Sequence, residues 1–493
     1  MTTSVFATNL LWVLLLANWV VEGNWKAKGQ ALCQSPLLQA FIVLAAVHIL
    51  WMAGTQNISY GLFDMQKKLP LLAIPLVVLT TPPLSHREQL PVAAAYCLTV
   101  LVMTFVGLGR YLTIPDLPYR NLVPHISHIR FGLNICLTLC IILYAMLHCR
   151  HWSFRLSGTL LSLWLLLFLL MLHAYTSFII LAVTAVVLLV AYGRRLPRRL
   201  FRLSALALTL LTLSAAALTG YYLHDYYHLR SLSTQPLRPC TANGNPYLHR
   251  HDGLIENGNY VHQYICEPEL RRGWSKVSTY PFDSVTATGY TIYPALLRYL
   301  GAMGLTKDSA GMSQLRPADI CAIEKGIANP VYLQPGPRKM FYVLFYEFEN
   351  FRCYRNVTGY TLLQRIELWR NAWQVLLRHP LLGVGTGDVV DQCRLQMQAS
   401  HSPLADSGMH THSQYLNFLL AFGLVGFLCI LLAFLRAIRL QHLCRNALFT
   451  AFLCILLISF ISEDTLETLA GITFAALGFT LLSNPTQCTN TTP

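Results

Sequence analysis

Charged side chains are scarce in this chain of 493 residues. Only 12% of the residues are Asp, Glu, Lys or Arg, whereas 54% are hydrophobic. Soluble domains usually carry about 25% charged residues, so the composition argues against an ordinary soluble fold. Nearly uncharged runs recur along the chain, and each is long enough to cross a bilayer. The composition therefore predicts an all-α, polytopic membrane protein.

The lengths of the apolar runs predict about eleven transmembrane helices, with twelve as the alternative. They lie near residues 5–22, 36–54, 69–83, 91–109, 130–147, 156–172, 176–193, 203–222, 413–435, 446–462 and 467–483. The first run lacks a basic stretch before it and a small-residue cleavage site after it. We therefore expect a membrane span there rather than a cleaved signal peptide.

The sequence also lacks the usual signatures of metal, nucleotide and nucleic-acid binding. No Cys-x-x-Cys pair or His/Cys spacing indicates structural zinc, and we expect no metal and no cofactor. Residues 383–387 lack the Gly-Lys-Ser/Thr ending of a Walker loop, so a turn is the better interpretation. The arginine cluster at residues 194–202 has no interleaved aromatic platform beyond Phe201, which argues against a nucleic-acid partner.

The formal net charge of +14 indicates which loops face the cytoplasm, more than it indicates a binding partner of opposite charge. Short arginine-rich loops favour the cytoplasmic side, which places residues 194–202 inside and, by alternation, the loop at residues 436–445 inside as well. The scheme divides the chain into an N-terminal transmembrane bundle (1–222), an extracytoplasmic, mostly helical insertion (223–409) and C-terminal transmembrane helices (410–493). Lys67 and Lys68 then fall outside, which counts mildly against it.

Five cysteines lie in the predicted insertion: Cys240, Cys266, Cys321, Cys353 and Cys393. In an oxidising compartment they could form up to two disulfides and leave one thiol over. The pairing cannot be read from the sequence.

An amphipathic helix is predicted from the spacing of Leu362, Ile366, Trp369, Trp373 and Leu376. Arg365 and Trp369 are four residues apart and share a face. An arginine beside a tryptophan at a membrane surface suits a diphosphate, because a guanidinium binds phosphate oxygens bidentately. The alternative, slightly favoured by this segment alone, is an interfacial helix with snorkelling arginines and an anchoring tryptophan.

Two further segments combine polar residues with span ends. His128 and Arg130 stand at the outer end of the fifth span, where Arg130 is either a functional charge or a snorkelling one. The carboxylates of residues 463–467 could balance the arginines or take a proton. However, Asp464 and Glu467 have capping-box spacing, so we expect them to cap the last helix.

His410 and His412 precede a long apolar helix. An imidazole titrates near neutral pH and suits a proton acceptor, and such a group is costly at a membrane edge unless it is solvated or used. A metal site with His401, Asp388 or Asp406 is a weaker alternative, because His-x-His alone is common. A plain interfacial histidine is the other alternative. All these segments fall on the outer side under one topology, which strengthens the functional interpretation.

These segments, taken in order, resemble a known family. Arg365-x-x-x-Trp369, His379-Pro-Leu-Leu-Gly-Val-Gly-Thr-Gly387 and His412-Ser-Gln-Tyr-Leu416 with Phe422-Gly-Leu-Val-Gly426 are similar to motifs of the O-antigen ligase and polymerase superfamily. Further segments resemble the Bacteroidetes-type members, among them Lys67-Lys-Leu-Pro70, His128-Ile-Arg-Phe131 and Glu463-Asp-Thr-Leu-Glu467. One departure is Ser413, where Asn is commoner, and it leaves the imidazole in place.

The resemblance implies a GT-C-like, metal-independent glycosyltransferase in the bacterial inner membrane, with an active site that faces the periplasm. The implied donor is a glycan on undecaprenyl diphosphate, and the ligase branch transfers it to a sugar hydroxyl of lipid A-core. His412 would activate that hydroxyl, and Arg365 would bind the diphosphate. Arg130 would be a second phosphate ligand, and Trp369 and His128 are candidates for contacts with the substrate.

Other activities remain open from the sequence. An O-antigen polymerase would use the same donor with a second lipid-linked glycan as acceptor, and a protein O-oligosaccharyltransferase is a third enzyme class. A polysaccharide or lipid transporter is the non-enzymatic alternative. A transporter predicts functional charges deep within several spans, and only Arg130 qualifies as an intramembrane charge.

Overall fold

The computed structural model describes residues 5–483, except residues 116, 150, 251, 287, 288, 290, 335, 358 and 360. Helices make up almost all of its regular structure, and the only sheet in these residues is one short hairpin. The chain divides into two compact units, residues 1–208 with 365–493 and residues 209–364. Each unit is described separately below.

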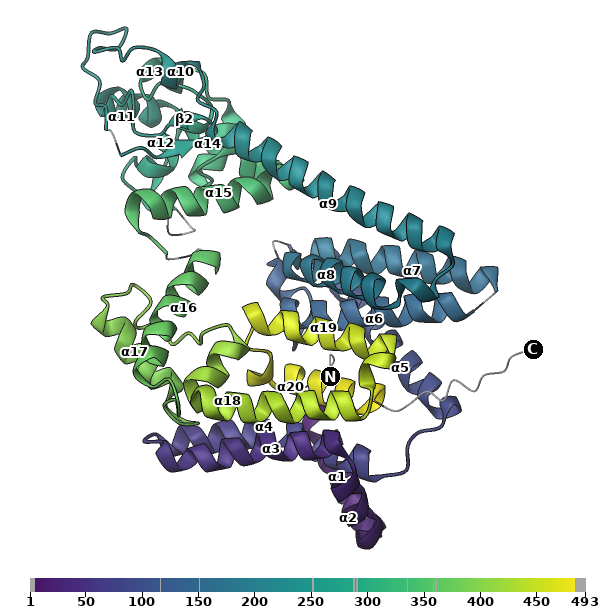
Figure 1. Ribbon diagram of the computed structural model, residues 1–493. Helices are drawn as coiled ribbons and strands as arrows, with labels where there is room; N and C mark the ends of the chain where they lie inside the picture. The colour runs from purple at the N-terminus through teal and green to yellow at the C-terminus, as the bar shows by residue number, and fades with distance from the viewer. Residues whose placement is uncertain are drawn as a thin grey trace. The chain divides into compact units, whose positions relative to one another are not determined.

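In the described residues of the first unit, all of the regular structure is helical. Its elements are α1 (Val5–Glu22), α2 (Trp25–Gln34), α3 (Pro36–Leu50), η1 (Trp51–Gly54), α4 (Ile58–Thr80), α5 (His86–Thr113), η2 (Tyr119–Asn121), α6 (His128–His148), α7 (Trp152–Met171), α8 (Tyr175–Tyr192), η3 (Gly193–Arg195), the start of α9 (Arg198–Tyr227), most of α16 (Thr361–Arg378), α17 (Val389–Ala399), α18 (Gln414–Leu440), η5 (Leu443–Arg445), α19 (Ala447–Ser462), η6 (Thr465–Glu467) and α20 (Leu469–Leu482). In its core, α18 packs along α3 and α20 packs along α4 (Figure 1).

The second unit is mostly helical and carries the hairpin. Its elements are the end of α9, α10 (Ser231–Thr234), β1 (Ile255–Glu256), β2 (Asn259–Tyr260), α11 (Glu267–Val277), α12 (Ile292–Ala302), α13 (Ser309–Met312), α14 (Pro317–Glu324), η4 (Pro330–Leu333) and α15 (Pro337–Tyr354). Strands β1 and β2 are antiparallel, and Trp274 of α11 packs with Tyr299 of α12 in a buried core. The unit therefore has an apolar core of its own.

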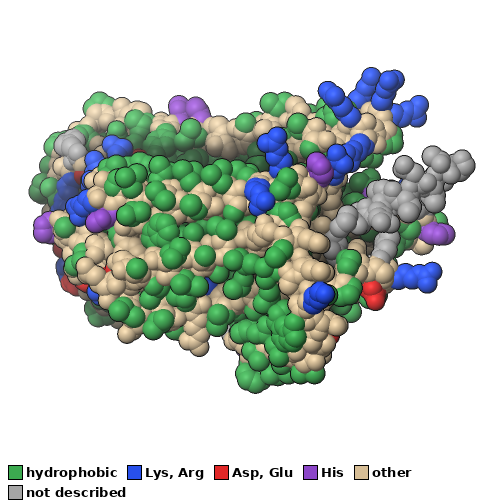
Figure 2. Space-filling model, turned by 60° about the horizontal axis from the view of Figure 1, so that its bottom comes forward, with side chains coloured by type: hydrophobic (Ala, Val, Ile, Leu, Met, Phe, Trp, Pro, Cys, Tyr) green, Lys and Arg blue, Asp and Glu red, His purple; other side chains and the backbone are tan. Residues whose placement is uncertain are grey.

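Within the described residues, seven helices are long and apolar enough to cross a membrane, or eight if the bent pair α1–α2 counts as one span. On the face in Figure 2, hydrophobic side chains cover the middle and most Lys and Arg side chains lie toward two edges. The prediction of a multi-pass membrane protein is confirmed, but the predicted number of about eleven spans is confirmed only in part.

The other three predicted spans correspond to α4, α19 and α20. Helix α4 contains Asp64, Lys67 and Lys68 in addition to its apolar stretch. Helices α19 and α20 have only 16 and 14 residues. At 1.5 Å per residue they extend about 24 and 21 Å, less than the hydrocarbon core of about 30 Å. The charged residues of α4 and the short lengths of α19 and α20 therefore explain why fewer helices qualify as spans than the sequence predicted.

The two arginine-rich loops lie at the same end of the first unit. Tyr192, at the end of α8, donates a hydrogen bond to the carbonyl of Cys444 in η5 and contacts Thr450 Oγ1 at 2.6 Å. At the other end, the ring of His173, just before α8, stacks on Tyr119 with ring centroids 4.7 Å apart. His128, which begins α6, contacts the same tyrosine ring and so belongs to this second end.

The predicted turn at residues 380–387 packs against a break in α18. Gly423 has a φ of +61° within this helix, which interrupts the regular hydrogen bonding. Four backbone hydrogen bonds close the break: Val384 N to Leu420 O, Gly385 N to Ala421 O, Leu424 N to Pro380 O and Val425 N to Leu381 O. The turn interpretation of the glycine-rich segment is confirmed, and the turn completes a membrane helix.

The sequence allowed up to two disulfides among five cysteines, and none of these five is paired in the structure. Cys240, Cys266, Cys321, Cys353 and Cys393 are all free thiols. Cys393 lies on α17 in the first unit, whereas the other four belong to the second unit.

Candidate functional site

His412 lies in the short segment that leads into α18, and its backbone is in the left-handed region with a φ of +50°. This conformation is uncommon for a residue with a side chain and persists only where the surroundings hold it. Two contacts do so. The Trp369 indole donates to Thr411 O at 2.9 Å, and Ser413 Oγ donates to Phe460 O at 3.2 Å.

The acidic turn between α19 and α20 is fixed to the same segment through Gln414, the first residue of α18. The backbone N–H of Gln414 donates to Glu463 O at 3.2 Å. Its side-chain oxygen accepts from Leu466 N at 2.8 Å. Gln414 is fully buried, so these bonds are made out of contact with solvent. The positions of His412 and of the carboxylates at 463 and 464 therefore depend on one shared residue.

Each carboxylate of this turn pairs with one of the predicted arginines. Arg365 Nη2 donates to Glu463 Oε1, and Arg130 Nη2 donates to Asp464 Oδ1 at 3.1 Å. All four side chains are at most 15% exposed. The Nε atoms of both arginines are buried and have no hydrogen-bond partner in the described residues. The guanidinium groups thus have unused donors beside their carboxylates.

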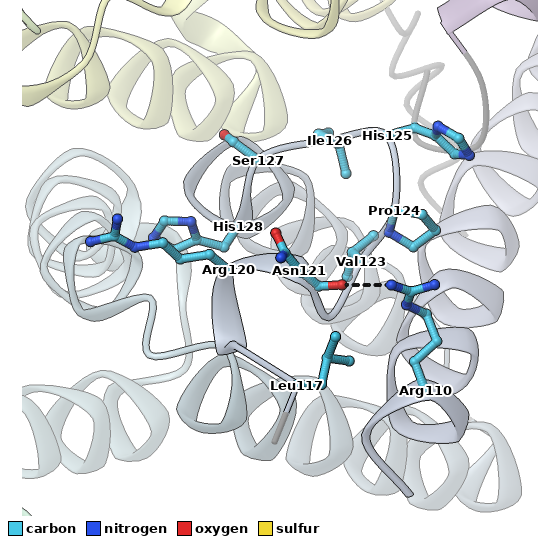
Figure 3. A pocket seen from close by; sticks show the side chains of 10 residues that line it. All are labelled: Arg110, Leu117, Arg120, Asn121, Val123, Pro124, His125, Ile126, Ser127 and His128. Atoms are coloured by element: carbon cyan, nitrogen blue, oxygen red, sulfur yellow. Dashed lines mark hydrogen bonds between the residues drawn. The ribbon is translucent and has the colours of Figure 1, made fainter. Parts of the chain in front are cut away.

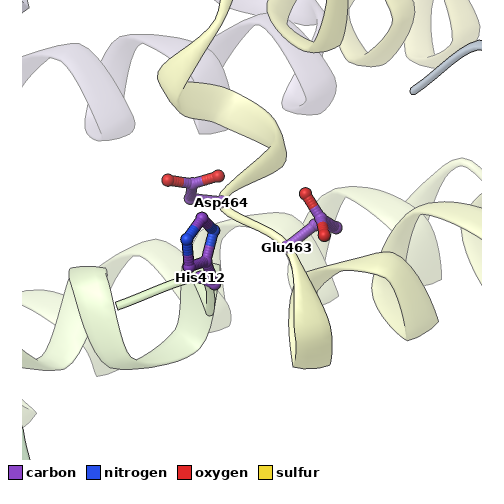
Figure 4. Close-up of side chains that lie close together, drawn as sticks. All are labelled: His412, Glu463 and Asp464. Atoms are coloured by element: carbon purple, nitrogen blue, oxygen red, sulfur yellow. The ribbon is translucent and has the colours of Figure 1, made fainter. Parts of the chain in front are cut away.

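His412 stands beside both acids, as Figure 4 shows. One possible ligand atom from each of His412, Glu463 and Asp464 lies within 4.8 Å of the other two. Neither ring nitrogen of His412 makes a hydrogen bond within the described residues, and Nδ1 is buried. A cation could use these three groups, but the two arginines already supply positive charge to the carboxylates. Free guanidinium donors beside an unpaired imidazole suit an anionic substrate better.

The electrostatic environment favours a neutral imidazole. Burial lowers the pKa of His412 from its usual 6.5, and Arg365 acts in the same direction, whereas the Asp464 carboxylate opposes the shift. Burial also raises the pKa of the Glu463 carboxyl, although Arg365 counteracts this. At neutral pH His412 can therefore accept a proton, and Asp464 stabilises the imidazolium that results.

The expected capping role of Asp464 and Glu467 is wrong. Helix α20 begins at Leu469, and its N-cap is Thr468, whose side chain accepts from Gly471 N. Asp464 pairs with Arg130, and Glu467 contacts Lys67 and Lys68. The spacing fits a capping box, but opposite charges from other helices bind these carboxylates instead.

The alternative metal site is not assembled either. Asp388 accepts hydrogen bonds from the backbone N–H groups of Gln56 and Asn57, at 2.7 and 2.8 Å. His401 and Asp406 are exposed, and neither belongs to the group around His412. The sequence offered these three residues only as the weaker alternative, and the acids that lie beside His412 in the structure are Glu463 and Asp464.

Lys67 and Lys68, which had counted against the predicted topology, belong to a buried charge cluster. Lys68 Nζ lies 2.7 Å from Asp64 Oδ2 and 2.9 Å from Glu467 Oε1. Lys67 Nζ lies 3.2 Å from Asp64 Oδ1 and 3.3 Å from Glu467 Oε2. The cluster neutralises both lysines and ties the acidic turn to α4.

His128 lies between this site and a cavity. Electrostatic interactions link it to Arg130 and Arg365. It also lines a cavity of about 570 Å³ formed by the segment between α5 and α6 (Figure 3). Of the five predicted site residues, Arg130, Arg365 and His412 thus meet at the acidic turn, Trp369 supports the backbone at Thr411, and His128 stands at the margin.

Fold and site together define a multi-pass membrane protein with a polar, charge-paired site at one end of its helices. Residues 341–431 match the family model described as O-antigen ligase. The resemblance to this family is confirmed over that segment, which contains Arg365, Trp369, His412 and the glycine turn. The family is one of glycosyltransferases that use lipid-linked glycans. No curated protein matches the chain.

Proposed function

We propose that this protein is an O-antigen ligase that transfers a glycan from undecaprenyl diphosphate to a sugar hydroxyl of lipid A-core. The observation that carries the proposal is the half-buried imidazole of His412, whose buried Nδ1 has no hydrogen-bond partner in the described residues, beside the two arginine–carboxylate pairs. Both His412 and Arg365 lie in the segment that matches the O-antigen ligase family. A neutral base and two guanidinium groups are the parts needed to activate a hydroxyl and stabilise a diphosphate leaving group.

The reaction is a single displacement. The acceptor oxygen forms a bond to the anomeric carbon, and the bond between that carbon and the diphosphate oxygen breaks. The proton of the attacking hydroxyl passes to the His412 imidazole, next to Asp464. The leaving electron pair stays on the diphosphate, whose charge Arg365 and Arg130 stabilise through N–H groups that their carboxylates leave unused. Attack from the opposite face inverts the anomeric configuration, and no step requires a metal.

The proposed location is the inner membrane, with the site facing the periplasm. The two arginine-rich loops share one end of the first unit, and short basic loops favour the cytoplasm. His128 and the contacts around Tyr119 belong to the other end. This arrangement supports an outward-facing site, where a lipid-linked glycan and lipid A-core meet.

The test is complementation of a deletion strain, read from lipopolysaccharide gels and lipid-linked intermediates. The deletion should give core-only lipopolysaccharide with accumulated lipid-linked polymer, and the wild-type gene should restore full O-antigen. His412→Ala, produced at the wild-type level, should not restore it, whereas His410→Ala should. A positioned general base contributes about 10²- to 10⁴-fold to the rate. Full O-antigen with His412→Ala would eliminate the base role.

The same experiment separates the alternative activities. A deletion that leaves a single-repeat ladder indicates a polymerase. Unchanged lipopolysaccharide together with lost protein glycosylation indicates a protein O-oligosaccharyltransferase. A transporter would leave transfer intact in a purified, reconstituted system that lacks this protein.

A further inference from the structure

The cavity between α5 and α6 has a strongly basic lining. Arg110, Arg120, His125 and His128 contribute to it, and its described lining contains no carboxylate. Figure 3 shows Arg110 and Arg120 on different sides of the loop that carries Asn121. A concave site lined by groups of one charge sign attracts ligands of the opposite sign. The cavity is therefore suited to an anion.

Neither arginine of this cavity forms an ion pair within the part of the chain that the structure describes. Arg110 Nη2 donates to the carbonyl of Asn121 at 3.3 Å, and its Nε is buried without a hydrogen-bond partner. Arg120 Nε donates to the hydroxyl of Tyr119 at 3.3 Å. Asp116, the only acid in the sequence between residues 111 and 127, lies outside the described residues. By contrast, Arg130 and Arg365 already hold carboxylates.

The cavity adjoins the candidate site through Ser127. This residue lines the cavity, and its hydroxyl oxygen accepts a hydrogen bond from Arg130 Nη1 at 3.2 Å. Arg130 in turn contacts Asp464, which stands beside His412. A ligand in the cavity would therefore lie next to the groups assigned to the donor diphosphate without using them.

We propose that this cavity binds a phosphate group of the acceptor glycolipid and thereby positions the acceptor hydroxyl near His412. The inference rests on the proposed transferase function, which assigns Arg365 and Arg130 to the donor and leaves the second substrate without an anchor. The lining supplies two guanidinium groups that hold no carboxylate within the described residues, and each can donate charge-assisted hydrogen bonds to the oxygens of a tetrahedral, multiply charged phosphate. A sugar hydroxyl alone would not need this concentration of charge.

The test uses the full-length protein in nanodiscs of uncharged lipid. Binding is measured for three probes: phosphorylated lipid A-core, the same glycolipid after enzymatic dephosphorylation, and undecaprenyl diphosphate. The variants are Arg120→Gln and the double change Arg110→Gln with Arg120→Gln. Arg199→Gln, an exposed arginine in the basic segment at the start of α9, is the matched control. Arg120 is itself exposed, so its single variant tests the cavity even if the double variant misfolds.

The expected result is at least about a tenfold weaker affinity of the double variant for the phosphorylated glycolipid, because each lost charge-assisted hydrogen bond costs about tenfold or more. Affinity for the dephosphorylated glycolipid and for undecaprenyl diphosphate should not change, and Arg199→Gln should behave as wild type. An equal loss for undecaprenyl diphosphate would assign the cavity to the donor and overturn the inference. Unchanged binding of the phosphorylated glycolipid would overturn it as well.

A fourth arm separates the glycolipid from bulk lipid. Nanodiscs of phosphatidylglycerol should not compete with the phosphorylated glycolipid for the wild-type cavity, and full competition would reduce the cavity to a headgroup anchor and overturn the inference. Failure of the proposed function has a different signature. In that case the wild-type protein transfers no glycan at all, whereas a wrong cavity assignment leaves transfer intact and glycolipid binding insensitive to Arg120→Gln.

Discussion

Lys68 Nζ on α4 lies 2.9 Å from Glu467 Oε1, in the turn that precedes α20. The contact joins segments about 400 positions apart in sequence, and both side chains are at most 12% exposed. Glu467 follows Glu463 and Asp464 within a few residues, so its position fixes the turn that carries them. The burial of the Glu467 carboxyl alone would raise its pKa, but Lys68 and Lys67 outweigh this and hold the pKa below its usual range.

Glu467→Gln should strongly destabilise the protein. It leaves Lys67 and Lys68 with Asp64 as their only acid partner in the described residues, and breaking a buried charge pair costs about 3–5 kcal/mol. We expect a lower midpoint of thermal unfolding in detergent micelles. Asp406→Asn removes an exposed acid and should leave the midpoint unchanged.

The same carboxylate predicts how stability depends on pH. Since the folded-state pKa of Glu467 is depressed, its contribution is complete above the unfolded-state value of 4.5 and decreases as the pH falls below it. The difference in midpoint between wild type and Glu467→Gln should therefore shrink in acid. A difference that is constant with pH would show that the variant acts through packing and not through charge.

Arg365→Lys should impair transfer although it keeps the positive charge. Lysine lacks the planar fork that allows one guanidinium to hold Glu463 and a diphosphate oxygen together. We expect at least about a tenfold lower kcat/KM for the lipid-linked donor, since charged hydrogen bonds contribute about 1.5–3 kcal/mol. Arg370→Lys, on the same helix but 77% exposed, is the control and should be silent. Equal activity of the two variants would reduce Arg365 to an interfacial anchor.

The pH profile of kcat/KM should have its acid limb below pH 6.5. His412 must be neutral to accept a proton, and burial lowers its pKa from 6.5. Asp464 raises this pKa, so in Asp464→Asn the limb should move to still lower pH, together with a loss of rate. Asp391→Asn, on α17, is the control. A limb that does not move in Asp464→Asn would mean that another group titrates.

The sequence predicted the helices and turns that carry the site better than it predicted the contacts between their side chains. The amphipathic helix with Arg365 and Trp369 is α16, and its end before Pro380 follows from the proline and the glycines. Local spacing carries such features, because a helical face and a helix end involve neighbouring residues. The number of spans was less predictable, because α4 mixes charge with apolar residues and α19 and α20 are short.

The partners of the charged residues could not be derived from spacing. Asp464 and Glu467 have the spacing of a capping box, and only the fold brings Arg130 and Lys68 close enough to compete for them. The same long-range packing explains how Lys67 and Lys68 are neutralised, because their partner Glu467 lies about 400 positions away in sequence. A balance of opposite charges among predicted outer segments was the available signal for these pairs.

Gly383→Ala should destabilise the turn that closes the break in α18. Its Cβ would lie 2.4 Å from Leu420 O, and the residue has a φ of +68°. Gly408→Ala is a matched control, because Gly408 has a φ of +62° and open space around it. The control should therefore show only the backbone cost, about 1–2 kcal/mol, and Gly383→Ala should cost clearly more. Equal unfolding midpoints of the two variants would contradict the packing role.

The proposed topology predicts the labelling of two exposed cysteines. Cys240 follows α9 in the second unit and should face the periplasm, whereas Cys444 lies in η5 beside the arginine-rich loop and should face the cytoplasm. In variants that each retain one of these thiols, a membrane-impermeant maleimide should label Cys240 in intact spheroplasts and Cys444 only after permeabilisation. The reverse pattern would place His412 in the cytoplasm, away from any periplasmic acceptor, and would refute the ligase proposal. Labelling of both thiols in intact spheroplasts would instead place Cys240 and Cys444 on the same side of the membrane. The proposed topology requires opposite sides, and therefore an odd number of spans between the two residues.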